Sequence, residues 1–114
     1  MVSGCSELAS ALLATGYSYS AELRYRHGEI VREVLLKARD VRCFGSAALQ
    51  LCWVACGRID AYFERDIKVW DYSAGALIAR EAGARTELPC PENDDLVLAA
   101  SPAVFDSLRA LVDR

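Results

Sequence analysis

The chain has 114 residues, of which 54% are hydrophobic and 25% are charged, a balance typical of one soluble globular domain with a single core. Its formal net charge of −3 provides no basic field for a phosphate backbone, which excludes general nucleic-acid binding as an expected function. The longest apolar run, 47–56, is shorter than the roughly 20 residues that cross a bilayer, and residues 1–16 lack the basic start of a signal peptide, so we expect a cytoplasmic protein with no membrane segment.

The first half of the chain alternates short apolar runs with helical periodicity. Residues 8–15 form an apolar run that could be a buried strand or a turn of helix. Apolar residues spaced three and four apart predict an amphipathic helix within 21–40, and a short strand is expected at 41–44. Residues 47–56 predict a helix that is apolar on nearly every side and must be covered all round, with Ser46 as its N-cap.

The second half continues this alternation. Aromatic and branched residues at 59–64 predict a strand, and 68–83 predicts a helix that ends at a glycine. Two more strands are expected at 84–88 and 96–100, and Ser101 followed by proline predicts a final capped helix. The order β-α-β-α-β-α-β-β-α predicts an α/β fold, a layered sandwich of alternating helices and strands.

The five cysteines fall in no pattern that predicts a disulfide framework. Cys52 and Cys56 lie four apart on a predicted helix and could share a metal ion. However, His27 is the only histidine, and the sequence groups no tetrahedral set of ligands. We therefore expect the cysteines to be small, buried hydrophobic residues.

Three features could carry chemistry, and each also has a simpler structural interpretation. Asp71 stands at or near the first turn of the helix 68–83, where an aspartate caps free N–H groups. The small residues 45–48 could present helix N–H groups to an oxygen-rich ligand, although tight packing explains them more simply. Glu64 ends a predicted strand, where a solvated carboxylate is the ordinary expectation. Taken singly, each pattern favours the structural interpretation.

Two strings taken together resemble a known family. GSAALQLCWVACGRIDAYFE at 45–64 and WDYSAGALIAREAG at 70–83 are similar to the C-terminal half of the inositol monophosphatase family, also called the extragenic suppressor type phosphatases. The signature of that family is a tryptophan-aspartate pair, then small residues, then Glu-Ala-Gly. It corresponds here to Trp70, Asp71, Ala74, Gly75, Glu81, Ala82 and Gly83. The resemblance extends over nearly the whole chain, from about Ser10 onward.

The resemblance implies a magnesium-dependent phosphomonoesterase that hydrolyses inositol monophosphate (myo-inositol 1-phosphate) or a related sugar phosphate. It implies roles for particular residues: Asp71 as a ligand of Mg²⁺, Glu64 as a contact to a substrate hydroxyl, and Gly45, Ser46 and Ala47 as the lining of the sugar or inositol pocket. Trp70 is expected to pack and to fix the loop that carries the aspartate. Hard carboxylate ligands suit metal ions that activate water and stabilise a leaving oxygen.

The chain departs from the family pattern at the metal site. The family's other metal ligands lie in an N-terminal half, in a glutamate-containing segment and in an Asp-Pro-x-Asp-Gly-Thr type motif, and neither string occurs among these residues. Gln50 also stands where many relatives carry an acidic or amide residue. We therefore expect 1–114 to be a single partial domain with no complete catalytic set, inactive alone, and whether it is an enzyme stays open.

The absent half also determines the partners that we expect. Besides a small-molecule phosphomonoester, the partners would be an N-terminal half or a second copy that forms a homodimer. Uncovering about 800 Å² of apolar surface forfeits up to about 20 kcal/mol, so the isolated chain is expected to be poorly soluble or to self-associate. A truncated reading frame and a split protein both fit this pattern. The alternative function is a non-catalytic remnant, or an interaction and dimerisation module of the same fold.

Overall fold

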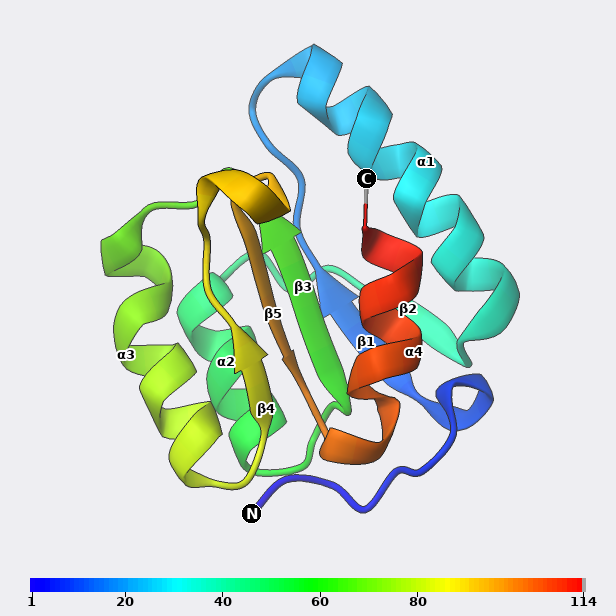
Figure 1. The fold of residues 1–114 in the computed structure, drawn as a ribbon, viewed down its shortest axis with the longest axis vertical. Coiled ribbons are helices and arrows are strands. Elements are labelled where there is room, and N and C mark those ends of the chain that lie inside the picture. Colours follow the sequence, from blue (N-terminus) through cyan, green and yellow to red (C-terminus); the bar gives the residue numbers. More distant parts are fainter. Residues whose placement is uncertain (114) are drawn as a thin grey trace.

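The computed structural model describes residues 1–113 and has three layers, with a five-stranded sheet between two pairs of helices (Figure 1). The elements in chain order are the 3-10 helix η1 (Leu8–Ser10), β1 (Leu12–Thr15), α1 (Ala21–Lys37), β2 (Asp40–Arg42), α2 (Ala47–Ala55), β3 (Ala61–Arg65), α3 (Val69–Glu81), β4 (Arg85–Glu87), the 3-10 helix η2 (Pro91–Asn93), β5 (Leu96–Ala100) and α4 (Pro102–Val112). The predicted α/β sandwich is confirmed. The apolar run 8–15 contains both alternatives, a helical turn followed by a strand.

The strands of the sheet lie in the order β2-β1-β3-β5-β4. β1 pairs in parallel with both β2 and β3, whereas β5 runs antiparallel to β3 and β4. The carboxyl ends of β1, β2 and β3 therefore meet at one edge of the sheet, and the loops that follow these strands gather there. In open α/β sheets this edge is where ligands bind.

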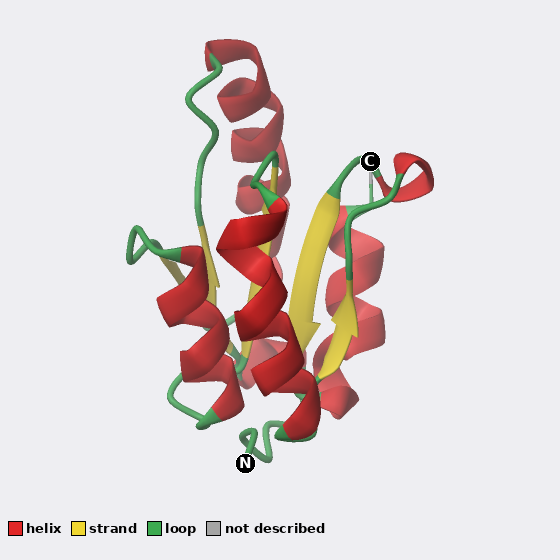
Figure 2. Ribbon diagram, turned by 90° about the vertical axis from the view of Figure 1, so that its left-hand side faces the viewer, coloured by secondary structure: helices red, strands yellow, loops and turns green. Residues whose placement is uncertain are grey.

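Helices cover both faces of the sheet. In Figure 2, α2 and α3 lie side by side in front of the sheet, and α1 and α4 lie behind it. Successive side chains of β3 point to opposite faces, so Tyr62 packs into the core beneath α2 and α3, whereas Phe63 packs into the core beneath α1 and α4. All five residues of β5 are buried, as expected for a strand that is covered on both faces.

The contact between α2 and α3 depends on Gly75. A Cβ atom built on Gly75 would lie 2.8 Å from the Cβ of Leu51 and 3.0 Å from its Cδ1. No side chain fits at this crossing, so the two helices can approach closely. Gly75 is one of the small residues of the family signature, and here its role is this close packing.

The helix ends agree with most of the sequence signals. The Oγ of Ser46 accepts a hydrogen bond from the N–H of Leu49 at 3.1 Å, which caps α2, and Gly83 follows α3 with a φ of 106°. The capping predicted for Ser101 was wrong. Its side chain makes no cap hydrogen bond and lies instead 2.8 Å from the Oγ of Ser3, which ties the N-terminal segment to the start of α4.

Two predictions about burial were also wrong. None of the five cysteines is buried. Cys52 is half-buried on α2, and the others lie in the N-terminal segment or in loops and turns rather than on strands of the sheet. Nor is α2 covered all round. The sheet and α3 cover part of this helix, and Leu49 on its other side keeps 41% of its surface exposed.

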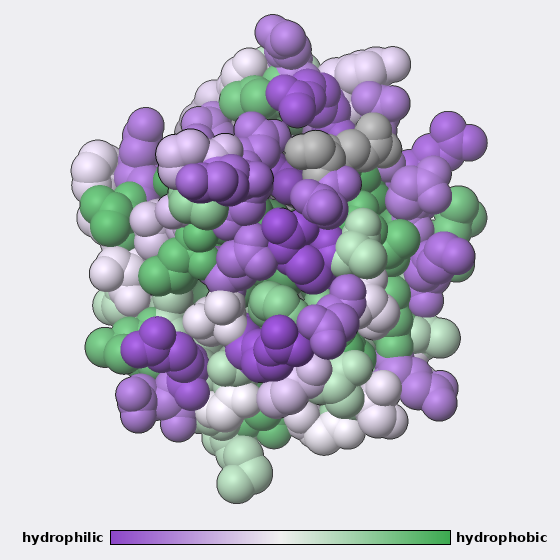
Figure 3. Space-filling view, in the orientation of Figure 1, coloured by the Kyte–Doolittle hydropathy of each residue, from purple (hydrophilic) through white to green (hydrophobic). Residues whose placement is uncertain are grey.

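Large apolar side chains are exposed mainly on two helices. They are Val69, Trp70, Leu77 and Ile78 on α3, and Tyr25, Leu35 and Leu36 on α1. Figure 3 shows apolar side chains at the left and right margins of the view, over α3 and α1, and mainly polar side chains across the middle. We call Leu49, Trp70, Leu77 and Ile78 the open face of α2 and α3. Over residues 1–113, no helix combines the length and the apolar character that crossing a bilayer requires.

Candidate functional site

A cavity of about 440 Å³ lies at the edge of the sheet where the parallel strands end. It is lined by Gly16, Tyr17 and Tyr19 after β1, by Cys43, Gly45, Ser46, Ala47, Ala48 and Gln50 after β2, and by Glu64, Ile67, Trp70 and Asp71 at and after the end of β3. The five residues predicted as site residues, Gly45, Ser46, Ala47, Glu64 and Asp71, therefore line one cavity although they come from separate parts of the chain.

The start of α2 forms one wall of the cavity. Gly45 has a φ of 81°, and a Cβ built on it would meet no atom within 4 Å. The prediction that tight packing explains the small residues here was thus wrong for Gly45, which is favoured by its left-handed backbone conformation. Because the hydroxyl of Ser46 already caps α2, the first N–H groups of the helix are the donors best placed to meet a ligand oxygen.

Gln50 holds the loop that leads into this wall. Its side chain is 1% exposed, and its Oε1 accepts a hydrogen bond from the backbone N–H of Phe44 at 3.0 Å. The ring of Phe44 meets that of Trp53 edge to face, with 4.7 Å between the centroids. The loop between β2 and α2 is therefore fixed from both sides.

Glu64 is buried rather than solvated, so the simpler sequence interpretation of this residue was wrong. Only 9% of its surface is exposed, and its Oε1 accepts a hydrogen bond from the hydroxyl of Tyr62 at 2.6 Å. Burial raises the pKa of the Glu64 carboxyl, an effect that the Tyr62 hydrogen bond opposes and that the nearby charge of Asp71 increases. Tyr62 was missed in the sequence, although two residues apart on one strand point to the same face.

Asp71 stands in the first turn of α3, as its helix-cap interpretation predicted. Its Oδ2 accepts a hydrogen bond from the backbone N–H of Lys68 at 3.2 Å. One carboxylate oxygen thus caps the helix, while the side chain also lines the cavity. The packing role predicted for Trp70 was wrong for this chain, because 77% of its surface is exposed on the rim of the cavity.

Carboxylate oxygen in the cavity lining is of the kind that coordinates magnesium. Asp71 places a hard carboxylate in the cavity lining, and magnesium in phosphate-handling sites commonly takes one or two protein carboxylates together with water and substrate oxygens. Across residues 1–113, no three histidine, cysteine or acidic side chains are grouped closely enough to hold a metal ion. Among the described residues of the cavity, Asp71 could therefore hold such an ion only together with ligands from elsewhere.

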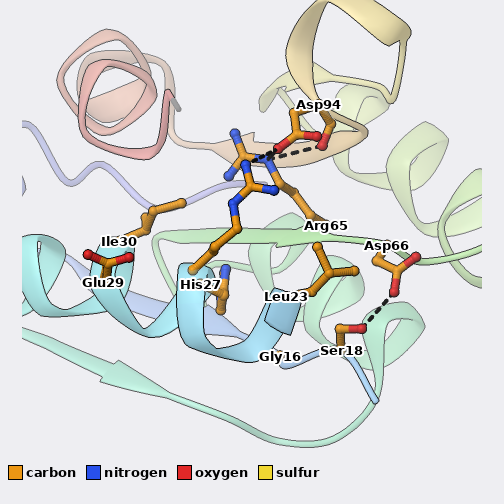
Figure 4. A pocket seen from close by; sticks show the side chains of 10 residues that line it. Gly16, Ser18, Leu23, His27, Glu29, Ile30, Arg65, Asp66 and Asp94 are labelled. Carbon is orange, nitrogen blue, oxygen red and sulfur yellow. Dashed lines mark hydrogen bonds and ion pairs between the residues drawn. The ribbon is translucent and has the colours of Figure 1, made fainter. Parts of the chain in front are cut away.

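A second cavity, of about 210 Å³, lies beside the first and beneath α1 (Figure 4). Both cavities reach Gly16. Side-chain nitrogens of Arg26 and Arg65 lie 3.4 and 3.7 Å from Oδ2 of Asp94. Figure 4 shows the side chains of Arg65 and Asp94 pointing toward one another. The hydroxyl of Ser18 donates to Asp66 at 2.6 Å, which joins the loop after β1 to the loop after β3.

His27 lies in the wall of this second cavity and is 7% exposed. Its ring packs against Tyr17 and Phe63, with centroid distances of 5.1 and 5.5 Å. Burial and, to a smaller extent, the positive charge of Arg65 together lower its pKa to about 4. The helical periodicity did not single out this histidine as a core residue, because a polar side chain does not contribute to an apolar stripe.

The comparisons with known proteins agree on one family. The model of the inositol monophosphatase family matches residues 1–110. A protein of Mycobacterium tuberculosis named inositol-1-monophosphatase SuhB is 49% identical over 114 residues, which cover 97% of this chain and 39% of that protein. An inositol-1-monophosphatase of Mycobacterium leprae is 46% identical, over 98% of this chain and 40% of its own length.

Solved structures show the same partial coverage. The structure of Mycobacterium tuberculosis SuhB superposes with a TM-score of 0.88 and covers 97% of this chain, but the match takes in only 44% of that structure. The inositol monophosphatase of Anabaena, at 35% identity, gives a TM-score of 0.84 over 97% of this chain and 46% of its own. The chain thus spans well under half the length of the relatives that it matches.

Proposed function

The chain belongs to the inositol monophosphatase family, and from this premise we propose that its larger cavity is one side of the active site of a magnesium-dependent phosphomonoesterase. The substrate would be inositol monophosphate or a related sugar phosphate. The observation that carries the proposal is the convergence of Gly45, Ser46, Ala47, Glu64 and Asp71 on one cavity at the carboxyl edge of the sheet.

Each side of the cavity suits a different part of such a substrate. The N-terminus of α2, with its first N–H groups and the positive end of the helix dipole, favours negatively charged oxygens. The buried carboxylate of Glu64 is an acceptor for a hydroxyl group of the sugar or inositol ring. Asp71 would hold Mg²⁺, which when bound supplies Lewis-acid stabilisation and an activated water.

We propose that the remaining metal ligands come from a further polypeptide portion that also covers the open face of α2 and α3. This chain matches 39% of the Mycobacterium tuberculosis protein, so most of that relative lies outside the match. Leu77 is 55% exposed and Ile78 is 49% exposed on that face, which leaves adjacent apolar surface in water. The site is therefore proposed to be complete only in an assembled protein.

The second candidate function is a non-catalytic interaction or dimerisation module. The same open face favours it, because an apolar surface that binds another protein needs no phosphatase chemistry. The two candidates differ in one observable property, namely whether phosphate release depends on the carboxylate of Asp71.

The test is a chimera in which the N-terminal portion of the Mycobacterium tuberculosis relative precedes this chain. We expect Mg²⁺-dependent release of phosphate from myo-inositol 1-phosphate, and loss of at least about 100-fold in kcat/KM for Asp71→Asn. Glu81→Gln, which removes an exposed charge at the far end of the same helix, is the matched control. A folded chimera that binds Mg²⁺ but releases no phosphate would favour the interaction module.

A further inference from the structure

We propose that Tyr62 and Gly16 are positioning residues that hold the Glu64 carboxylate so that one oxygen is left to accept a hydroxyl of the ligand. The inference rests on the proposed function and deepens it. Tyr62 and Gly16 would determine why the site prefers phosphate esters of polyols to phosphomonoesters that lack ring hydroxyls.

The first part of the arrangement is the hydrogen bond from Tyr62. This tyrosine has no exposed surface, and its ring belongs to the core beneath α2 and α3. Its hydroxyl, at the cavity end of that core, donates to Oε1 of Glu64 at 2.6 Å. A buried ring cannot turn away from this contact without disturbing its neighbours, so the position of the hydroxyl is fixed by the core.

The second part is the absence of a side chain at Gly16. A Cβ built there would lie 2.4 Å from Oε1, 2.6 Å from Cδ and 2.7 Å from Oε2 of Glu64. All three contacts are with the carboxylate group, which therefore lies directly against the backbone of Gly16. This glycine is not among the residues with positive φ, so space rather than backbone conformation explains why it is a glycine.

The two contacts together define what the carboxylate can do. Oε1 is directed at Tyr62, and the backbone of Gly16 limits rotation of the group, so Oε2 is the oxygen best placed to accept from a ligand. A hydroxyl donor satisfies such an acceptor, and leaving a buried acceptor without a donor is costly. A ligand with a ring hydroxyl at this point gains the contact, and one without it gains nothing from Glu64.

A purely structural role for the Tyr62 hydroxyl gives a different expectation. If the hydrogen bond only satisfies a buried polar group, its removal would lower stability and would affect all substrates alike. If the hydroxyl positions Glu64, its removal would affect only substrates whose hydroxyl reaches that carboxylate.

The experiment compares two substrates in the chimera described above. For Tyr62→Phe we expect the KM for myo-inositol 1-phosphate to rise by about 3- to 10-fold, the effect of one misplaced hydrogen bond, with kcat/KM for p-nitrophenyl phosphate unchanged within about twofold. Gly16→Ala is expected to show the same selective loss. Tyr72→Phe, which removes a tyrosine hydroxyl on α3 away from the cavity lining, is the control. An equal loss on both substrates, or no loss on either, would overturn the proposal.

A second measurement does not depend on activity. Carbon-13 NMR of glutamate carboxyl groups follows the titration of Glu64 in the wild type and in Tyr62→Phe. Because the hydrogen bond favours the carboxylate, we expect the titration midpoint of Glu64 to rise in the variant and to stay unchanged in Tyr72→Phe. An unchanged midpoint in Tyr62→Phe would refute the positioning contact. A raised midpoint in a chimera without phosphatase activity would support the contact while the proposed function fails.

Discussion

The hydroxyl of Thr15 lies 2.7 Å from Nε2 of His27 and 2.6 Å from the backbone oxygen of Phe63. A hydroxyl has one proton to donate, and the carbonyl of Phe63 can only accept, so Thr15 donates to Phe63 and accepts from Nε2–H of His27. The imidazole is thereby fixed in the tautomer protonated at Nε2. This chain of contacts connects β1, β3 and α1 at the wall of the second cavity. The lowered pKa of His27 keeps its ring neutral at neutral pH.

His27 should make the stability of the protein fall as the solution is acidified. The folded-state pKa of about 4 lies below the ordinary value of 6.5, so the unfolded chain binds a proton that the folded chain does not bind between these values. The stability is fully present above pH 6.5 and decreases as the pH falls towards 4. Between pH 7.5 and pH 5 the loss is about 2 kcal/mol.

Urea unfolding at pH 7.5 and pH 5, at one protein concentration, measures this change. In His27→Gln, whose amide can still donate to Thr15 but does not titrate in this range, we expect the decrease to disappear. The raised pKa of Glu64 acts in the opposite direction in both proteins, so the difference between them isolates the histidine. The same decrease in His27→Gln would show that another group is responsible.

Glu64→Gln should stabilise the protein at neutral and alkaline pH. A carboxyl whose pKa is raised in the folded state contributes stability below its unfolded pKa, and this contribution is lost as the pH rises through the folded pKa. Glutamine keeps an acceptor for the hydroxyl of Tyr62 and carries no charge to bury. After allowance for solvent on the cavity side, we expect a gain of about 1 kcal/mol at pH 8 and none at pH 4.

Thermal unfolding of the variant at these two pH values checks the prediction, with Glu81→Gln as the exposed control. A loss of stability at pH 8 would mean that the charge of Glu64 is satisfied by contacts other than Tyr62. The same variant should have lost selectivity for hydroxyl-bearing substrates, so stability and function would change in opposite directions, as is common at active sites.

Local sequence patterns predicted the elements well and predicted the environments of single residues poorly. The strand 96–100 has the expected bounds because a short apolar run bounded by turn residues is typical of a buried strand. Gly83 follows the end of α3 because glycine readily adopts a positive φ. The strand order and the burial of Glu64 depend on contacts between segments far apart in the chain. No local pattern places the carboxylate of Glu64 against Gly16 of another strand end, so the solvated carboxylate expected at Glu64 was wrong.

Asn93 should be essential to the connection between β4 and β5. Its side-chain oxygen accepts from the backbone N–H groups of Cys90 and Leu96, and its Nδ2 donates to Leu88 O and to Oε2 of Glu87. Asn93→Ala leaves these partners unpaired in a buried position, at an expected cost of about 2–3 kcal/mol. Asn93→Asp restores the acceptor but places a carboxylate against Glu87, so it should also destabilise. Chemical denaturation checks both, and a neutral result for alanine would contradict the assigned role.

The open face of α2 and α3 should make the isolated chain self-associate. Light scattering during size-exclusion chromatography is expected to show oligomers or aggregates, and Leu77→Glu should shift the protein towards monomer by placing a charge on that face. Leu36→Glu, on the exposed side of α1, is the matched control and should have little effect if the open face is responsible. A wild-type chain that is a monodisperse, sharply melting monomer would contradict the prediction.

Two glycines in helices should respond in opposite ways to the same substitution. In Gly75→Ala the new methyl group would lie 2.8 Å from the Cβ of Leu51, so α2 and α3 must separate, and we expect a loss of about 1–3 kcal/mol. In Gly28→Ala, within α1, the methyl group meets no atom within 4 Å, and alanine in a helix interior should stabilise by up to about 1 kcal/mol. Urea unfolding of both variants at one protein concentration measures the two effects. Because helix propensity favours alanine at both positions, a loss confined to Gly75→Ala can be assigned to the contact with Leu51, whereas stabilisation of both would show that the helix crossing tolerates a side chain.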